Sequence, residues 1–188
     1  NPPLSTKISR RKDRSRVVQR DFGLRTPWFM SAAVCSQGEP NKVPSGVSYP
    51  CVAKPVTLSA SRGVIRANND QELVAALARI SKIIESAGPE HPRVVLIEEY
   101  IPGMEYVVEG LLDSGNWRTM AIFGKPEPLE GPFFEETIYI APPDLAPGIE
   151  RRMTDTVRDA CAAYGLVQGP VHAECRINED GVWLIELA

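Results

Sequence analysis

The sequence predicts an α+β protein in which mostly antiparallel sheets are covered by helices on one side. Two stretches, near residues 70–86 and 149–164, carry apolar residues at helical spacing. Around them lie runs that alternate with a period of two or turn back after a short polar loop, as antiparallel strands do. A chain of 188 residues can form one large domain or two small ones.

The composition is that of an ordinary globular protein. Hydrophobic residues make up 43% and charged residues 24% of the sequence, and the net charge is −3. This charge argues against a general nucleic-acid binder, and we read the locally basic first twenty residues as a solvated helix face rather than a nucleic-acid arm. Since no apolar run approaches the roughly 20 residues of a membrane helix, we expect no membrane partner.

The four cysteines, Cys35, Cys51, Cys161 and Cys175, show no CxxC spacing. Cys51 and Cys175 fall on apolar strand faces, which favours buried free thiols in a reducing compartment. We therefore expect a cytoplasmic protein. The sequence begins at Asn1 without Met and stops within an expected strand, so we expect a fragment at both ends.

The first half is expected to contain a helix, a strand and a second helix. Residues 6–22 form a charged helical stretch, and residues 36–50 form a loop rich in Gly, Pro and Ser. A short buried strand is expected in "YPCVAKP". Asn69 and Glu72 form a capping pair for an amphipathic helix over 70–86.

The second half is expected to be richer in strands. We expect a strand in "RVVLIEEYIPG", a hairpin in "EYVVEGLLDSGNWRTMAIFGKP" and another strand in "FFEETIYIAP". Apolar residues from Ile149 to Tyr164 mark a helix with Gly165 as its C-cap. The chain closes with a hairpin in "VHAECRINEDGVWLIELA".

Two glutamates face each other in this last hairpin. A three-residue loop at 179–181 pairs residue 178 with 182, 176 with 184 and 174 with 186, and it places Ile185 on the apolar face. The Cβ atoms of Glu174 and Glu186 are then roughly 4.5–5.5 Å apart, where like charges are destabilising. Either a cation such as Mg²⁺ sits between them, or one glutamate turns out to solvent at a sheet edge.

Several common nucleotide and metal motifs, GxxxxGK[ST], GxGxxG and HExxH, are absent. The stretch "KPVTLSASRGV" instead joins Lys54 to a loop that contains Ser59, Ser61 and Gly63. This stretch is either an anion-binding nest of N–H groups, hydroxyls and an ammonium, or a surface loop with an exposed lysine. Further along, "EEYIPGMEYVVEG" offers backbone groups to a purine edge and Glu105 to ribose hydroxyls.

A cationic strand end, a flexible loop, an acidic hinge and a hairpin with facing carboxylates follow one another in an order that resembles the ATP-grasp ligases. The resemblance spans nearly the whole chain, from "STKISRRK" through "YPCVAKPVTLSASRGV", "VLIEEYIPGMEYVVEG" and "GPFFEETIYIAP" to "GPVHAECRINEDGVWLIELA". The sequence looks closest to the amino-acid ligase and carbamoyl-phosphate-synthase-like members. The resemblance implies an ATP-grasp fold, with two α+β subdomains that grip ATP between antiparallel sheets. The implied division is an N-terminal helical segment at 1–28, a lid subdomain at 29–99 and a C-terminal subdomain at 100–188.

The resemblance also implies roles for individual residues. Phosphates meet two lysines under the lid loop, adenine is lined by the hinge, and Glu105 meets the ribose. The implied ATP-binding residues are Lys7, Lys54, Ser59, Ser61, Gly63, Glu98, Tyr100, Ile101 and Glu105. Glu174 and Glu186 are implied to hold Mg²⁺ or Mn²⁺.

The implied catalytic residues are Lys54, Glu136 and His172. His172 lies on the polar face beside Glu174, where it orients a ligand, acts on an amine or is a hydrogen-bonded structural residue. The resemblance implies an ATP-dependent ligase that joins a small-molecule carboxylate, such as an amino acid, to an amine through an acyl phosphate and releases ADP. The alternative is a nucleotide-binding module without turnover. The 188-residue chain by itself is expected to be inactive, and a homodimer is left open.

Overall fold

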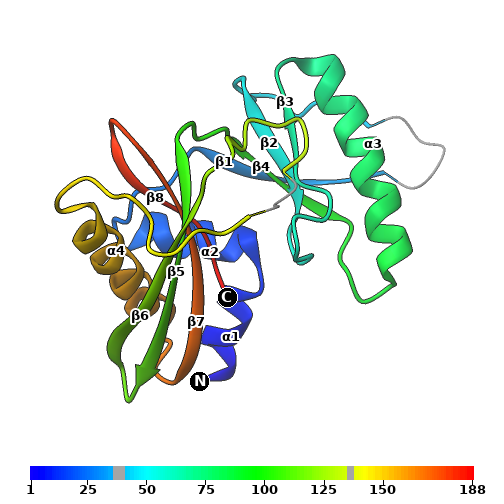
Figure 1. Ribbon diagram of the computed structural model, residues 1–188. Helices are drawn as coiled ribbons and strands as arrows, with labels where there is room; N and C mark the ends of the chain where they lie inside the picture. Colours follow the sequence, from blue (N-terminus) through cyan, green and yellow to red (C-terminus); the bar gives the residue numbers. More distant parts are fainter. Residues whose placement is uncertain (36–40, 135–137) are drawn as a thin grey trace. The chain divides into compact units, whose positions relative to one another are not determined.

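The computed structural model describes residues 1–35, 41–134 and 138–188, which form two compact units (Figure 1). The larger unit comprises Asn1–Thr26, Ile101–Leu129 and Glu136–Ala188, and the smaller unit comprises Pro27–Tyr100 and Glu130–Glu135. Each unit has its own four-stranded sheet, and all strand pairs in both sheets are antiparallel. The expected α+β class is thus confirmed.

The sheet of the smaller unit has the strand order β1-β4-β2-β3. The elements of this unit are β1 (Phe29–Ala33), β2 (Cys51–Pro55), β3 (Ile65–Ala67), α3 (Asp70–Ala87) and β4 (Val94–Glu99). Leu73 and Ile80 of α3 pack in one buried cluster with Ala53 and Ile97 of the sheet. Because strand residues alternate between faces, the opposite face carries the other residues of β2 and β4.

The sheet of the larger unit has the strand order β6-β5-β7-β8 (Figure 1). The elements of this unit are α1 (Pro3–Ser9), α2 (Lys12–Asp21), β5 (Met104–Asp113), β6 (Asn116–Lys125), α4 (Ile149–Tyr164), β7 (Gly169–Asn178) and β8 (Gly181–Leu187). Met153 and Val157 of α4 share a buried cluster with Val108 and Ala173 of the sheet. Ile8 and Val18 pack against the same cluster, so all three helices of this unit cover one face and leave the other for polar groups.

Local signals in the sequence predicted several ends of elements correctly. The Glu72 N–H donates to Asn69 Oδ1 at 3.0 Å, and Asn69 Nδ2 donates to Glu72 Oε1 at 2.8 Å, as expected for a capping pair. Helix α4 ends at Gly165, whose φ of 69° is the left-handed conformation that glycine adopts without steric cost. The hairpin of β5 and β6 turns over 113–116 as predicted.

The single helix expected over 6–22 is wrong, because two helices, α1 and α2, occupy this stretch. Arg11 between them is extended, with φ −121° and ψ 100°. The Ser15 hydroxyl donates to the Ile8 carbonyl at 2.8 Å, so the break is stabilised by a side chain of the second helix. The charged helical pattern of residues 6–22 gives no sign of this side-chain hydrogen bond, so the break was not predicted.

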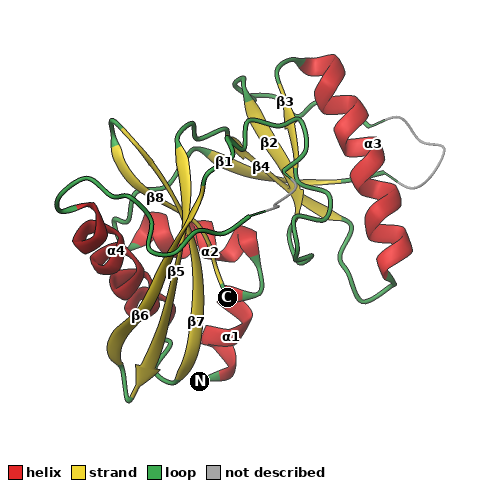
Figure 2. Cartoon of the chain, in the orientation of Figure 1, coloured by secondary structure: helices red, strands yellow, loops and turns green. Residues whose placement is uncertain are grey.

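The strand expected in "FFEETIYIAP" is also not formed in the described part of this segment, which Figure 2 draws as loop. Phe133 and Ile140 make single antiparallel bridges to Ile65 and Gly124. Pro142 and Pro143, which follow, have no N–H for a ladder. Conversely, β1 and β3 were not predicted, and both are short strands of three to five residues at the edges of their sheet.

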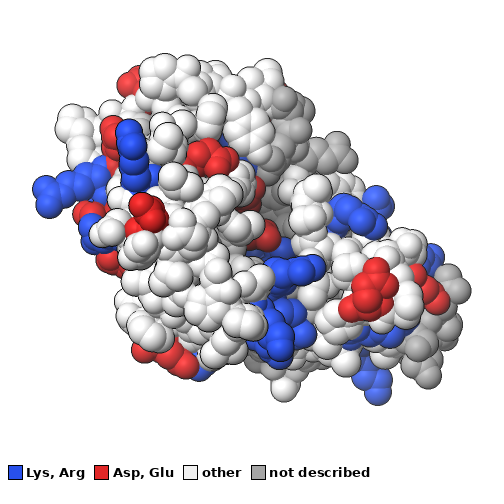
Figure 3. All heavy atoms as spheres, turned by 90° about the horizontal axis from the view of Figure 1, so that it is seen from below, with Lys and Arg blue, Asp and Glu red and all other residues white. Residues whose placement is uncertain are grey.

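None of the helices in the described ranges is long and apolar enough to cross a membrane. On the face presented in Figure 3, Lys and Arg side chains are interspersed with Asp and Glu side chains. This mixture agrees with the small net charge of −3.

Candidate functional site

The helix-free face of the larger unit's sheet carries a row of charged side chains from all four strands. The register of the sheet brings them together, because it pairs Glu105 with both Lys125 and Arg176. It also pairs Glu109 with His172 and Glu174 with Glu186. Polar residues two apart on one strand lie on the same face, so these pairs form one continuous charged surface. Its members are Glu105, Glu109, Lys125, His172, Glu174, Arg176 and Glu186.

The predicted pairing of Glu174 with Glu186 is confirmed, but the expected register of the hairpin is wrong. Asn178 pairs with Gly181 across a two-residue turn, and Cys175 pairs with Leu184. A bulge at Ile185 then inserts one extra residue in β8, after which Glu186 lies opposite Glu174. Two errors in the sequence reasoning, the turn length and the missing bulge, therefore cancelled at the two glutamates.

The bulge also changes the residues that fill the core. Val182, Leu184 and Leu187 are buried, whereas Trp183 and Ile185 are only partly buried. The expected apolar face, which contained Ile185, is thus wrong for most of β8. A one-residue shift moves every side chain of a strand to the other face, and the bulge restores the expected orientation for Glu186 and Leu187.

Each of the two facing glutamates has its own lysine. Lys12 Nζ lies 2.8 Å from Glu186 Oε1, and Lys125 Nζ lies 3.2 Å from Glu174 Oε1. The side chains of Glu174 and Glu186 are 19% and 27% exposed to solvent, while those of Lys12 and Lys125 are only 9% and 3% exposed. The two ammonium groups, both largely buried, offset the repulsion between the two carboxylates.

Glu105 is the centre of a buried network. Its Oε1 accepts from Lys125 Nζ at 2.6 Å, and its Oε2 accepts from Arg176 Nε at 2.8 Å. Arg176 also donates to the carbonyls of Ile101 at 2.8 Å and Leu129 at 2.9 Å. A carboxylate has about four acceptor positions, so Glu105 retains capacity for another donor such as a ribose hydroxyl.

His172 lies between two carboxylates on the same face. Glu174, with Oε1 3.8 Å from Nε2, and Glu109, with Oε1 2.7 Å from Nδ1, raise the pKa of His172 to about 9. At neutral pH both ring nitrogens are therefore protonated and the imidazole is positively charged, so it could donate a proton but not accept one. Glu109 was missed by the sequence reasoning, although its alternation with Glu105 on β5 placed both on one face.

In the smaller unit, predicted nucleotide residues gather on the face of the sheet opposite α3. Lys54 Nζ lies 2.5 Å from Glu98 Oε1, and both side chains are almost fully buried. The two residues are diagonal neighbours, because Lys54 pairs with Leu96 while Glu98 pairs with Val52. The predicted exposed-lysine alternative is excluded for Lys54.

Tyr100 follows Glu98 on the same face. The Arg66 guanidinium lies 4.1 Å from the centre of its ring, within the range of a cation–π contact. The Tyr100 ring also lies 6.4 Å from that of Phe134. Tyr100 therefore contacts a cation and lies near a second aromatic ring, and both of these residues belong to the smaller unit.

The loop after Lys54 turns tightly over residues 60–63. Arg62 N–H donates to Ser59 O at 3.3 Å, and Val64 N–H donates to Ser61 O at 3.1 Å. Ser61 and Gly63 have positive φ values of 52° and 77°, which gives the turn a left-handed backbone. Such backbones direct successive N–H groups to one side and suit anions.

One predicted residue, Lys7, does not join these groups. Lys7 is exposed on α1, and the cation that the N-terminal segment brings to the glutamates is Lys12. Glu136 lies outside the described residues. The signal for Lys12 was a polar stripe at helical spacing on α2, whose buried residues are Lys12, Ser15, Arg16 and Gln19.

The donor set on β7 and β8 fits a magnesium ion that is shared with a ligand. Across the described ranges, no group of three or more His, Cys, Asp or Glu side chains is arranged to hold a metal. Mg²⁺ commonly takes only one or two protein carboxylates and completes its shell with phosphate oxygens and water. Glu174 and Glu186 supply such a pair, and both remain partly accessible.

The chain is similar to several known proteins. The D-alanine–D-alanine ligase of Pseudomonas putida (strain GB-1) is 25% identical over 193 residues, which covers 98% of this chain and 55% of that protein. The crystal structure of an L-amino acid ligase from Bacillus licheniformis superposes with a TM-score of 0.83 at 30% identity, over 100% of this chain and 44% of the ligase. A D-alanine–D-alanine ligase from Bacillus anthracis in complex with ATP gives a TM-score of 0.71 at 20% identity, over 98% of this chain and 56% of that one, which shows the fold alone.

The chain thus spans about half the length of the curated relatives it matches. A family model, described as the ATP-grasp domain, matches residues 47–188, which is more than half of the chain. The matched range includes β2 with Lys54 and both glutamates of the last hairpin. The chain therefore belongs to the ATP-grasp domain family.

Proposed function

We propose that this chain is the nucleotide-binding part of an ATP-dependent ligase that joins a carboxylate to an amine through an acyl phosphate. The observation that carries the proposal is the pair of facing glutamates, each held by its own lysine. A partly accessible surface of neighbouring carboxylates and ammonium groups suits a polyanion that arrives with a divalent cation. The relatives named above, which are D-alanine–D-alanine and L-amino acid ligases, support amino acids as the substrate class.

Each unit carries its own candidate ligands. The smaller unit supplies Lys54 and the loop with Ser59, Ser61 and Gly63 for phosphates. Its hinge supplies Glu98 and Tyr100 for adenine, and Ile101 follows in the larger unit.

The larger unit supplies Glu105 for the ribose and Glu174 with Glu186 for Mg²⁺ or Mn²⁺. We assign the second phosphate-binding cation to Lys12, because it is the lysine of the N-terminal segment that reaches the glutamates, whereas Lys7 is exposed. When bound, the metal neutralises charge on the phosphate oxygens.

The chemistry needs no nucleophilic side chain. A substrate carboxylate oxygen attacks the γ-phosphorus, the bond from that phosphorus to the β–γ bridging oxygen breaks, and ADP leaves. The amine nitrogen then attacks the acyl carbon, phosphate leaves and the amine loses a proton. Phosphoryl transfer of this kind depends on positioning and charge neutralisation, which is what a face with fixed lysines and carboxylates provides.

Calorimetry and turnover together test the proposal. Titration of Mg–ATP into the chain should give binding that Lys54→Met and Glu186→Gln both weaken at least tenfold. ADP formation by the protein with its native flanking sequence should depend on added amino acids. Binding without ADP formation would favour the alternative, a nucleotide-binding module without turnover. An absence of Mg–ATP binding would contradict both.

A further inference from the structure

Helix α2 buries polar residues where a helix of a globular protein normally buries apolar ones. Arg16 is only 2% exposed and lies against β8. Its Nη1 donates to the Leu184 carbonyl at 2.6 Å and to Gln19 Oε1 at 2.7 Å, and its Nη2 donates to the Ile185 carbonyl at 3.1 Å. Because a buried guanidinium is costly to desolvate, its hydrogen bonds must offset that cost.

The β-bulge at Ile185 explains why a donor is needed at this position. A bulge leaves backbone groups of the extra residue outside the strand ladder, and buried carbonyls need a donor elsewhere. The two carbonyls that Arg16 binds belong to the bulged residue and to the residue before it. The planar fork of a guanidinium can reach both at once, which a lysine ammonium cannot do in the same geometry.

The bulge decides where Glu186 points. Continued without a bulge, the pairing of Cys175 with Leu184 would set Glu174 opposite Ile185 and Ala173 opposite Glu186. Glu186 would then face the helices and the apolar cluster, because a one-residue shift reverses the faces of a strand. With the bulge, Ala173 pairs with Leu187, and Glu186 joins Glu174 on the charged face.

We infer that Arg16 is a positioning residue for the carboxylate pair: it holds the bulge at Ile185 open and so sets Glu186 opposite Glu174. Lys12, one helical turn earlier on α2, then meets the Glu186 carboxylate itself. Helix α2 thus fixes both the backbone and the side chain of this glutamate. The consequence for metal binding rests on the proposed function, whereas the consequence for strand register does not.

Strand register is measured directly by NMR. His172 and Ala188 exchange both N–H···O bonds at 2.9 Å, so the adjacent pair of Ala173 and Leu187 is a non-hydrogen-bonded pair with close Hα atoms. The parent protein should show a cross-strand Hα–Hα NOE between Ala173 and Leu187. In Arg16→Lys and Arg16→Met this NOE should be lost or severely reduced. The control is Arg14→Met, which removes one positive charge from an exposed position of the same helix and should retain the NOE.

Metal affinity gives the second readout, with Mn²⁺ and a non-hydrolysable ATP analogue followed by electron paramagnetic resonance. Arg16→Lys should weaken Mn²⁺ binding at least tenfold. In a Glu186→Gln background the same change should produce no further loss, because Arg16 acts through Glu186. An Arg14→Met protein should bind Mn²⁺ as the parent does.

The outcomes separate the two proposals. If the parent shows the NOE but does not bind Mn²⁺ with the analogue, the proposed function fails, and the NOE in the Arg16 variants still decides the role of Arg16. If Arg16→Lys folds and keeps the NOE, the inference is overturned. If neither Arg16 variant folds, or if Arg14→Met also loses the NOE, the inference is overturned as well, because the residue or the helix would be a general requirement of the fold.

Discussion

Variants of the buried ion pair of Lys54 and Glu98 allow its effect on stability to be measured separately from its effect on nucleotide binding. In Lys54→Met the side-chain stem is kept and the ammonium is lost, so the almost fully buried Glu98 carboxylate loses a partner at 2.5 Å. Removing one member of a buried ion pair costs about 3–5 kcal/mol. Lys54→Met should therefore destabilise the smaller unit, apart from its effect on nucleotide binding.

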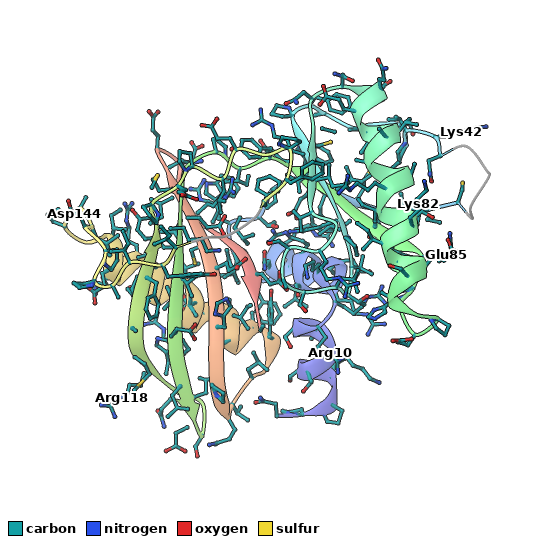
Figure 4. All side chains as sticks on the ribbon, turned by 45° about the vertical axis from the view of Figure 1, so that its right-hand side comes forward. Arg10, Lys42, Lys82, Glu85, Arg118 and Asp144 are labelled. Carbon is teal, nitrogen blue, oxygen red and sulfur yellow. The ribbon has the colours of Figure 1, made fainter. Side chains whose placement is uncertain are left out.

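Urea unfolding measures the loss of stability in Lys54→Met. With a slope of about 1–2 kcal/mol per molar urea for a small unit, a loss of about 3 kcal/mol lowers the midpoint by about 1.5–3 M. Lys82→Met is the matched control, because Lys82 is an exposed lysine on α3 of the same unit (Figure 4). Its midpoint should stay within a few tenths of a molar of the parent.

The double variant Lys54→Met/Glu98→Leu completes the test. Replacing a buried ion pair by apolar side chains of similar size is often neutral or stabilising, so at least half of the lost stability should return. The affinity for Mg–ATP, measured by calorimetry, should not return, and it should stay at least tenfold, or about 1.4 kcal/mol, below the parent. A double variant that regains both would show that Lys54 is structural only, and a Lys54→Met protein as stable as Lys82→Met would refute the energetic argument.

Three further predictions concern other parts of the chain. Glu186→Gln should lower the free energy of unfolding by about 1–3 kcal/mol without metal, because the nearly buried Lys12 loses its carboxylate, and Mg–ATP should raise its melting temperature less than that of the parent. Asn69→Ala should cost about 0.5–2 kcal/mol in the same unfolding assay through the lost helix cap, whereas an unchanged value would show that the cap is energetically silent. Burial raises the pKa of three thiols to about 11 or 12, so at pH 8 they stay protonated and should resist iodoacetamide until urea exposes them, as mass spectrometry can show for Cys51, Cys161 and Cys175.

Elements with strong local signals could be predicted from the sequence. Helix α3 has an apolar stripe and a capping pair, α4 has a stripe and a terminal glycine, and the β5–β6 hairpin has a polar turn between apolar runs. Each of these features depends on residues within about one turn or one strand of each other, which is the range over which propensity and capping act.

The parts that could not be predicted depend on contacts between distant residues. The bulge in β8 is held by Arg16, 168 and 169 residues away from its two carbonyl partners. The buried face of α2 is polar, so an analysis of apolar periodicity reads the helix as a solvated one. The polar stripe on α2 contains Lys12, but the stripe alone does not show that Lys12 meets Glu186, because that contact depends on the packing of β8 against α2.

The charge balance of the larger unit's polar face bears on how a metal would bind there. Three carboxylates and three cations form two sets of ion pairs on this face. Lys12 pairs with Glu186, and a second set links Glu174, Lys125, Glu105 and Arg176 in that order. A divalent cation that entered alone would meet carboxylates already neutralised by buried ammonium groups, and it would be repelled by those groups. A cation that arrives with a triphosphate brings its own anion, and the lysines then have phosphate oxygens to neutralise while the glutamates turn to the metal. The balance of charges on this face therefore favours the joint binding of metal and nucleotide over the binding of either one alone.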